Sequence, residues 1–258
     1  MIISAGLLII SYLSIYVNPA KAWFMTIFGL LFYPLLLVNV LLLVWALLRR
    51  SKAVVIPLVA LIPTLLIFGK FFRFSTSRDD TSKGLKIVSY NVGRFALPQG
   101  VTFSSRKECA DSIMAFLRAG DADIICLQEV YVQNKERVLS YLSRQMKGYD
   151  IQYYVNVNKY GSCGNVTFSR YPALSKGHID FEHSSNMALY SDYCIGGDTL
   201  RVYNCHFESY NISLSRLATG LEKDYKKAVK DTEEKMRRSI VRRPRQVEQV
   251  LKDIENCR

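Results

Sequence analysis

The sequence predicts an α+β sandwich preceded by a membrane segment of apolar helices. Three observations support this fold class. The first 73 residues hold six basic residues and no Asp or Glu, whereas all 22 acidic residues follow later. Residues 22–48 carry no charge at all. From residue 85 onward, many short segments of strand length alternate with few helical patterns, which is typical of a sandwich.

This uneven distribution excludes several classes of protein. Half of the net charge of +12 falls within the first 73 residues. A purely soluble protein, a disordered chain, a collagen and a small disulfide scaffold do not fit such a pattern. The remaining residues, about 185 of them, are enough to bury a sizeable core.

Three membrane spans are predicted in the first domain, residues 1–73. Residues 22–48 exceed the ~20 apolar residues that a helix needs to cross a bilayer. Weaker spans are predicted at residues 2–17 and 53–69, where neighbouring helices can satisfy the carbonyls freed by Pro57 and Pro63. The alternative for the first run is a cleaved signal peptide, because residues 20–22 resemble a small-x-small cleavage site. No basic region precedes that run and a second span follows directly, which favours the span.

The orientation in the membrane is predicted from three cations. Arg49, Arg50 and Lys52 lie in the short loop between the second and third spans, and the positive-inside rule places such a loop in the cytoplasm. The third span then leaves the following domain outside. Basic residues after that span favour the opposite orientation, although a long domain responds less to them.

A polar linker, residues 74–84, leads into a domain predicted over residues 85–258. Residues 85–91 form the first expected strand, and a helix around Cys109 to Leu117 ends near Gly120. A continuous apolar strand at 124–127 and a second helix at 135–146 follow. The remaining expected strands are residues 151–157, 165–169, 174–180, 188–195 and 200–207.

The last part of the chain is strongly basic. Residues 216–245 contain eleven basic and five acidic residues, a composition that fits binding to phosphates or anionic lipid headgroups. The alternative is a solvated helix face with Glu–Lys pairs at helical spacing. Pro244 is expected to interrupt this stretch, and an amphipathic helix is expected to follow it to the end.

Polar residues at the ends of apolar strands are candidates for a site. Asn91 ends the first strand, Glu129 ends the second, and His206 ends the last. An amide oxygen and a carboxylate are the hard ligands that Mg²⁺ prefers, and a nearby histidine can bond a phosphoryl oxygen or assist proton transfer. Taken singly, each residue also has an ordinary structural reading, as a turn former, a solvated strand end or a satisfied histidine.

Four segments resemble the endonuclease/exonuclease/phosphatase superfamily, and they occur in that family's order: residues 86–92 (KIVSYNV), 122–129 (ADIICLQE), 164–172 (GNVTFSRYP) and 200–207 (LRVYNCHF). The resemblance extends from about residue 85 to the end. It implies a four-layered α/β/β/α sandwich that hydrolyses phosphoester bonds with a divalent metal, Mg²⁺ or Mn²⁺. It also suggests a membrane-anchored bacterial type, held in an inner membrane. The orientation predicted from Arg49, Arg50 and Lys52 then places the soluble domain on the periplasmic side.

The resemblance implies a role for each candidate residue. Asn91 and Glu129 correspond to the residues that bind the metal, which acts as a Lewis acid. His206 is expected beside the scissile phosphate, where its imidazolium stabilises developing charge. Asn204 of the same Asn-x-His element, and Arg170, which matches a phosphate-binding arginine of the deoxyribonuclease branch, are expected to contact the substrate. The alternative for Arg170 is a structural arginine before a turn proline.

Two further motifs of the family are absent from the sequence. No Gly-Asp-x-Asn follows His206, and no Ser-Asp-His occurs; the only Gly-Asp, at Gly197 and Asp198, precedes the last expected strand. We therefore expect an incomplete sandwich that lacks roughly a hundred residues on family analogy. Such a sandwich has an unpaired sheet edge, and we expect no measurable turnover from this chain.

The predicted function is a membrane-anchored, metal-dependent phosphoesterase whose partners are a lipid bilayer and a phosphoester. Nucleic acid, a phospholipid or sphingolipid headgroup, and a soluble phosphoester all remain open as substrates. The rival prediction is a non-catalytic membrane protein with a degenerate sandwich that binds nucleic acid or a protein. No feature of the sequence indicates an obligate protein partner.

Overall fold

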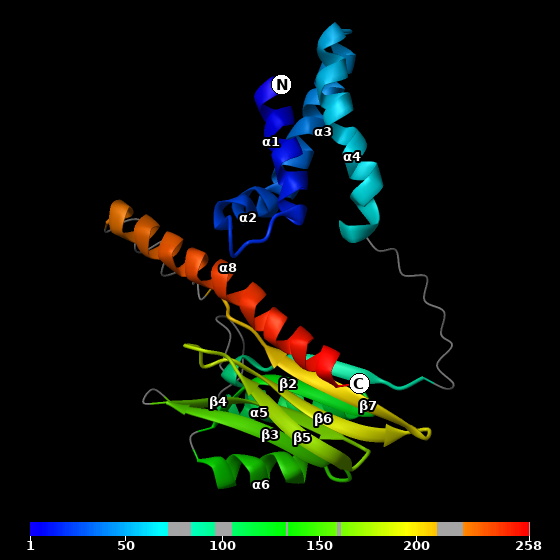
Figure 1. Cartoon of the computed structure of the whole chain (residues 1–258), viewed down its shortest axis with the longest axis vertical. Coiled ribbons are helices and arrows are strands. Elements are labelled where there is room, and N and C mark those ends of the chain that lie inside the picture. Colours follow the sequence, from blue (N-terminus) through cyan, green and yellow to red (C-terminus); the bar gives the residue numbers. More distant parts are fainter. Residues whose placement is uncertain (72–83, 96–104, 133, 159–160, 211–223, 258) are drawn as a thin grey trace. The chain divides into compact units, whose positions relative to one another are not determined.

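The structure is a computed structural model that describes residues 1–71, 84–95, 105–132, 134–158, 161–210 and 224–257. The predicted linker, residues 74–84, lies outside these residues except for Gly84. The chain divides into two compact units (Figure 1). The first comprises Met1–Asp79 and Ser209–Arg245, and the second comprises Asp80–Glu208 and Gln246–Arg258. Residues 209–245 are therefore grouped with the N-terminal apolar helices, although the sequence predicted them within the second domain.

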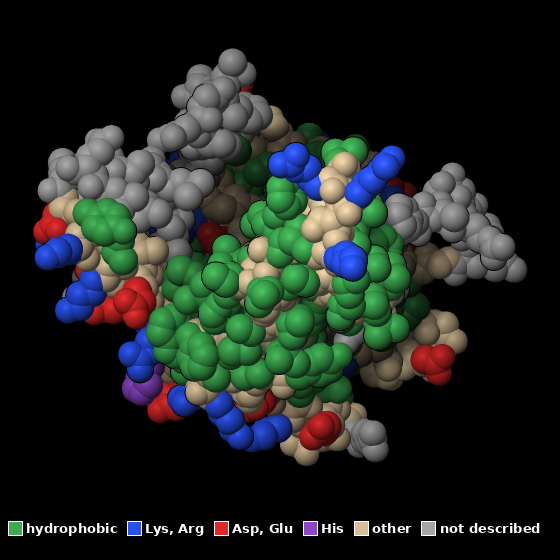
Figure 2. Space-filling model, turned by 90° about the horizontal axis from the view of Figure 1, so that it is seen from above, with side chains coloured by type: hydrophobic (Ala, Val, Ile, Leu, Met, Phe, Trp, Pro, Cys, Tyr) green, Lys and Arg blue, Asp and Glu red, His purple; other side chains and the backbone are tan. Residues whose placement is uncertain are grey.

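Four apolar helices form the first part of the first unit, with two short 3₁₀ turns, at Ser14–Tyr16 and Lys52–Val54, beside them. Figure 2 shows hydrophobic side chains forming a broad surface. Many large apolar side chains of these helices are exposed, as expected of helices that face lipid rather than water. The helices are α1 (Ile2–Leu13), α2 (Trp23–Leu30), α3 (Phe32–Leu48) and α4 (Val55–Phe71).

The expected single span over residues 22–48 is not one straight helix, because a bend of 48° separates α2 from α3. The break falls at Leu31, which leaves the helical conformation at ψ 3°. Pro34 explains its position, because a proline has no N–H to donate and its ring clashes with the carbonyl four residues earlier, here that of Leu30. A proline is tolerated in the first turn of α3, so the chain starts a new helix there.

The number of spans is also smaller than expected. In the described part of the chain, Lys52–Gly69 is the single segment long and apolar enough to cross a membrane, or there are two if α2 and α3 count as one bent span. The first run forms a shorter apolar helix, Ile2–Tyr16. Three separate spans are therefore not supported. Pro63 lies inside α4 without ending it, as the sequence analysis allowed.

The second unit contains two sheets. In the first sheet the strand order is β1-β2-β4-β3, with β1 and β2 parallel and the other pairs antiparallel. In the second sheet the order is β5-β6-β7, all antiparallel. The strands are β1 (Ile87–Asn91), β2 (Ile124–Val132), β3 (Asp150–Asn158), β4 (Gly161–Ser169), β5 (Ala173–Asp180), β6 (Met187–Ile195) and β7 (Asp198–His206).

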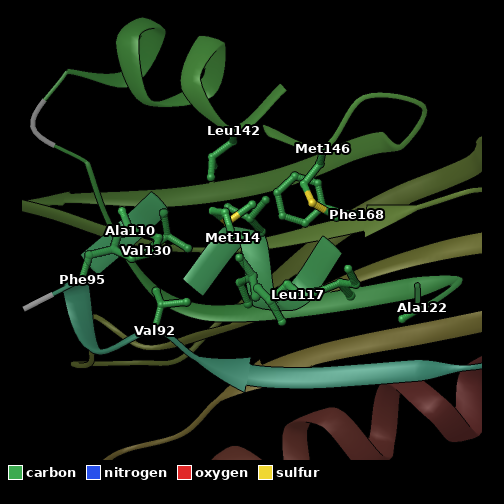
Figure 3. Close-up of a cluster of buried hydrophobic side chains, with 13 residues drawn as sticks. Val92, Phe95, Ala110, Met114, Leu117, Ala122, Val130, Leu142, Met146 and Phe168 are labelled. Carbon is green, nitrogen blue, oxygen red and sulfur yellow. The ribbon is translucent and has the colours of Figure 1, made fainter. Parts of the chain in front are cut away.

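Alternating residues of β2 explain how the layers pack. Ile125 and Leu127 face the helices α5 (Arg106–Ala119) and α6 (Lys135–Gln145), in the core drawn in Figure 3. Ile124 and Cys126 face the second sheet and pack with Tyr193 of β6. A strand buried on both faces reads as a continuous apolar run, which is how the sequence predicted it. The mixed α/β architecture with two sheets agrees with the predicted fold class.

The final helix, α8 (Tyr225–Asn256), passes through Pro244 without a break. The predicted interruption is therefore wrong. Ile240 and Gln246, on either side of the proline, are both buried, and such packing overrides local helix propensity. Further along α8, Val250 packs on Phe181 and Ala188 of the second unit.

Candidate functional site

A β-bulge in β2 shapes the candidate site. Leu127 pairs with Val166, but Val130 pairs with Gly164, so β2 has one more residue than β4 over this interval. Glu129 lies in the bulge with a left-handed φ of 56°. A bulge changes the direction of the side chain that it carries. The Glu129 carboxylate consequently meets residues from the ends of β1 and β7.

Asn91, Glu129 and His206, the three residues expected to lie together, converge on one carboxylate oxygen. The Asn91 side-chain amide donates to Glu129 Oε1 at 2.9 Å. His206 Nε2 lies 3.3 Å from the same oxygen. The Glu129 and His206 side chains are 27% and 22% exposed, so the cluster is accessible to a small ligand. Because β7 belongs to the second sheet, the cluster joins both sheets.

The surroundings of Glu129 keep it ionised. The hydrogen bond from His206 is the largest effect, and it outweighs burial, which acts in the opposite direction. The hydrogen bond from Asn91 and the positive charges of His206 and Arg94 act in the same direction as the His206 bond, and together they lower the pKa of Glu129 to about 2. At neutral pH the site therefore presents a carboxylate.

Arg94 is a site residue that the sequence analysis missed. It belongs to a short turn, Gly93–Phe95, in which all three residues have left-handed φ values of 54°, 62° and 50°. This turn follows β1 and brings the guanidinium near Glu129 and into a hydrogen bond with Cys163. A glycine two residues after the end of a strand, followed by a cation, was the signal for it.

Asn204 is not in the accessible cluster. Its side chain lies between the sheets and is 1% exposed. Its amide nitrogen donates to the carbonyls of Leu127 and Val166 and to the Thr167 hydroxyl, at 3.0–3.1 Å, and its amide oxygen accepts from Gln128 at 2.7 Å. The predicted substrate contact is therefore corrected: Asn204 joins the two sheets through buried hydrogen bonds.

Arg170 lies at the opposite end of the first sheet. Because β4 runs antiparallel to β2, Ser169 pairs with Ile124, the first residue of β2. Arg170 follows Ser169 and is thus about 17 Å from Glu129 along the strand. Its guanidinium pairs with Asp121, and its Nε donates to the Tyr149 hydroxyl at 3.2 Å. These contacts favour the structural alternative for Arg170, and its phosphate contact stays a prediction.

The donor set suits a hydrated magnesium or manganese ion. The site offers one ionised carboxylate, of Glu129, and one amide oxygen, of Asn91, which also accepts from the Gly93 N–H at 2.9 Å. Mg²⁺ is commonly held by one or two carboxylates and keeps several waters. In the described part of the chain, no group of three or more His, Cys, Asp or Glu side chains is placed to hold a metal. The residues present therefore fit a sparsely held hard cation.

Comparisons with known proteins identify two regions. A sequence model described as the endonuclease/exonuclease/phosphatase family matches residues 88–251. A second model, described as a domain of unknown function (DUF8431), matches residues 1–71. Among curated proteins, none matches the chain.

Solved structures show weak similarity to the chain. An endonuclease/exonuclease/phosphatase from Beutenbergia cavernae is 17% identical, with a TM-score of 0.40, over 50% of this chain and 39% of that one. A family protein from Leptotrichia buccalis is 14% identical, with a TM-score of 0.39, over 54% of this chain and 62% of that one. Danio rerio TDP2, complexed with a single-strand DNA product, is 19% identical, with a TM-score of 0.38, over 54% of this chain and 55% of that one.

The chain thus spans between 39% and 62% of the length of these three proteins. The family assignment comes from the sequence model, whose match to residues 88–251 includes Asn91, Glu129 and His206. The chain belongs to the endonuclease/exonuclease/phosphatase family.

Proposed function

We propose that this protein is a membrane-anchored phosphoesterase whose site depends on a divalent metal. Asn91 and Glu129 would hold Mg²⁺ or Mn²⁺, and His206 would contact the phosphate. One observation carries the proposal: side chains from three strands and both sheets converge on the Glu129 carboxylate. Strand ends hold such groups rigidly, which a binding site for a small ion requires.

The bound ion would supply Lewis-acid polarisation of the phosphoryl oxygens. The chain's own residues prepare the site for it. Glu129 stays ionised because His206, Asn91 and Arg94 stabilise its charge. His206 donates a hydrogen bond toward charge that develops on the phosphate, and Arg94 adds a second cation beside it. Asn91 is fixed in place by its bonds to Glu129 and to the Gly93 N–H.

We expect this chain to bind metal and phosphate without measurable turnover. The family resemblance assigns water positioning and proton transfer to a Gly-Asp-x-Asn and a Ser-Asp-His motif, and neither follows His206. Robust Mg²⁺-dependent hydrolysis by the purified chain would contradict this expectation.

The membrane anchor favours a lipid-borne phosphoester as substrate. The helix segment Lys52–Gly69 is long and apolar enough to hold the chain in a bilayer. The periplasmic orientation remains a prediction, based on Arg49, Arg50 and Lys52. Nucleic acid is the competing substrate class. A competition experiment distinguishes the two classes. Vesicles containing sphingomyelin or inositol lipids and a short single-stranded DNA are each tested for competition with inorganic phosphate at the site.

The decisive experiment measures Mn²⁺ binding by the full chain in detergent, using electron paramagnetic resonance. Glu129→Gln removes the charge but keeps the shape, and we expect its affinity to fall at least about tenfold. Asp121→Asn, at the opposite end of the first sheet, is the matched control and is expected to bind as the wild type does. Equal affinities of the two variants would reject the proposed metal site.

A second measurement tests the phosphate contact. Bound Mn²⁺ broadens the ³¹P resonance of inorganic phosphate that binds next to it. His206→Gln is expected to weaken this broadening and to leave Mn²⁺ affinity within about twofold of the wild type, because His206 is not a proposed metal ligand. A wild-type chain that binds neither ion would support the non-catalytic alternative.

A further inference from the structure

The first part of α8, residues 225–245, belongs to the first unit and is strongly basic. We call it the basic segment. It carries three acidic residues, Asp231, Glu233 and Glu234. Against these stand nine cations: Lys226, Lys227, Lys230, Lys235, Arg237, Arg238, Arg242, Arg243 and Arg245. Such an excess on one helix predicts an anionic partner.

The three acidic residues of the basic segment form no ion pair with its cations among the described residues. The sequence offers five pairs at a spacing of four residues: Lys227 with Asp231, Lys230 with Glu234, Asp231 with Lys235, Glu233 with Arg237, and Glu234 with Arg238. None of these pairs is among the ion pairs formed in the described part of the chain. The reading of this stretch as a solvated face with Glu–Lys pairs therefore loses its main support.

The basic segment is also amphipathic. Tyr225, Val229, Met236 and Ile240 follow one another at spacings of four, seven and four residues and so share one side of the helix. Ile240 is buried, whereas Tyr225 and Val229 are exposed. A basic helix with an exposed apolar edge is typical of helices that lie in a membrane interface.

One contact connects the basic segment with the membrane segment. The Arg237 guanidinium lies over the Trp23 ring, 6.0 Å from its centroid. Trp23 is the first residue of α2, one of the four apolar helices. Tryptophan is enriched at the boundary between membrane and water, so a cation stacked on it lies at the level of the headgroups. Lys226 and Lys230 share the Arg237 side of the helix, because they precede it by eleven and seven residues.

We propose that the basic segment is an interfacial helix that binds the headgroups of anionic phospholipids. The proposal rests on the membrane anchoring in the proposed function. Each Lys or Arg near an anionic surface adds a favourable interaction with it, and the exposed Tyr225 and Val229 enter the acyl boundary. Nucleic acid would use the same cations, but it would not account for the exposed apolar edge or for the contact with Trp23.

The test uses the full chain with Trp45→Phe, which leaves Trp23 as its single tryptophan. The protein is reconstituted in vesicles of equal mole fractions of phosphatidylcholine and phosphatidylglycerol, with brominated acyl chains on one lipid or the other. We expect brominated phosphatidylglycerol to quench Trp23 more strongly. In the variant Lys226→Gln/Lys230→Gln/Arg237→Gln this preference should fall, by up to about fivefold for each cation that contacts a headgroup.

A matched control carries Lys135→Gln/Arg137→Gln/Arg144→Gln, which removes three exposed cations from α6. This variant should keep the preference. Equal quenching by both lipids in the wild type, or an equal loss in both variants, would overturn the proposal. So would a triple variant that keeps its lipid preference but loses affinity for a short single-stranded DNA. Failure of the chain to float with vesicles would instead reject the membrane anchoring itself.

Discussion

The two ends of the first sheet both carry charged side chains, but they hold them differently. At one end, Asn91, Glu129 and His206 come from three strands and meet in a partly buried cluster. At the other end, Arg170 and Asp121 form a pair whose side chains are 41% and 76% exposed. The first arrangement fixes a carboxylate in a defined position, whereas the second is a surface ion pair of the kind that contributes little.

The difference shows that strand direction decides which motif residues share a site. Residues 165–170 belong to a segment that resembles the family. Because β4 runs antiparallel to β2, each later residue of this segment lies further from Glu129. β1 and β2 are parallel, so Asn91 and Gln128 end up side by side. The predictions below test this contrast between the ends, together with a second contrast between a buried and an exposed Arg–Asp pair.

The largest effect on stability is expected from Asn204, which is buried between the two sheets near the end that carries Glu129. Asn204→Ala removes four buried hydrogen bonds that join the two sheets. We expect the free energy of unfolding to fall by about 3 kcal/mol. Asn91→Ala is the matched control, because Asn91 is exposed; it should weaken Mn²⁺ binding and leave stability nearly unchanged.

Modification of Cys126 in increasing urea measures this stability. Cys126 is buried, and burial raises the pKa of its thiol to about 11, so it reacts only when the sandwich opens. If Asn204→Ala and Asn91→Ala shift the modification midpoint equally, the assigned difference between the two asparagines is wrong.

A second contrast compares two Arg–Asp pairs. Arg201 grips Asp192 in a bidentate pair, with Nε to Oδ1 at 2.6 Å and Nη2 to Oδ2 at 2.8 Å, and both side chains are largely buried. Asp192→Asn is expected to lower the free energy of unfolding by about 2 kcal/mol. Asp121→Asn, in the exposed pair, should change the free energy of unfolding by no more than the experimental error. If both variants lower the free energy of unfolding equally, burial does not explain the difference between the two pairs.

The buried pair should also make stability depend on pH. The hydrogen bonds from Arg201 hold the pKa of Asp192 below its usual value. A carboxyl whose pKa is lowered by folding contributes stability above its unfolded pKa, about 4, and loses it as the pH falls through the folded value. The difference in stability between wild type and Asp192→Asn should therefore shrink below about pH 4. Urea midpoints measured from neutral to acidic pH give this difference.

The smallest effect is expected at the far end of the sheet. Arg170→Gln removes an exposed guanidinium that pairs with Asp121 and Tyr149. Because it is remote from Glu129, we expect unchanged Mn²⁺ affinity and unchanged broadening of the phosphate resonance. A loss of phosphate binding in this variant would restore the role that the resemblance assigned to Arg170.

The sequence predicted the order of helices and strands in the second unit and the meeting of Asn91, Glu129 and His206. These predictions succeed because apolar alternation and strand ends are local signals. It could not distinguish Asn204, two residues before His206, as buried, because that depends on how the two sheets face each other. Pro34 could have predicted the bend at Leu31. The uncharged run around it is long enough for one spanning helix, however, and therefore predicted a single span.

Glu129 occupies a left-handed backbone position that a side chain with a β-carbon enters only at a cost of about 1 to 2 kcal/mol. The backbone conformation alone would favour glycine there. Glu129→Gly would remove this backbone cost, but it would also delete the carboxylate that Asn91 and His206 contact. Backbone conformation and side-chain bonding therefore oppose each other at this single residue.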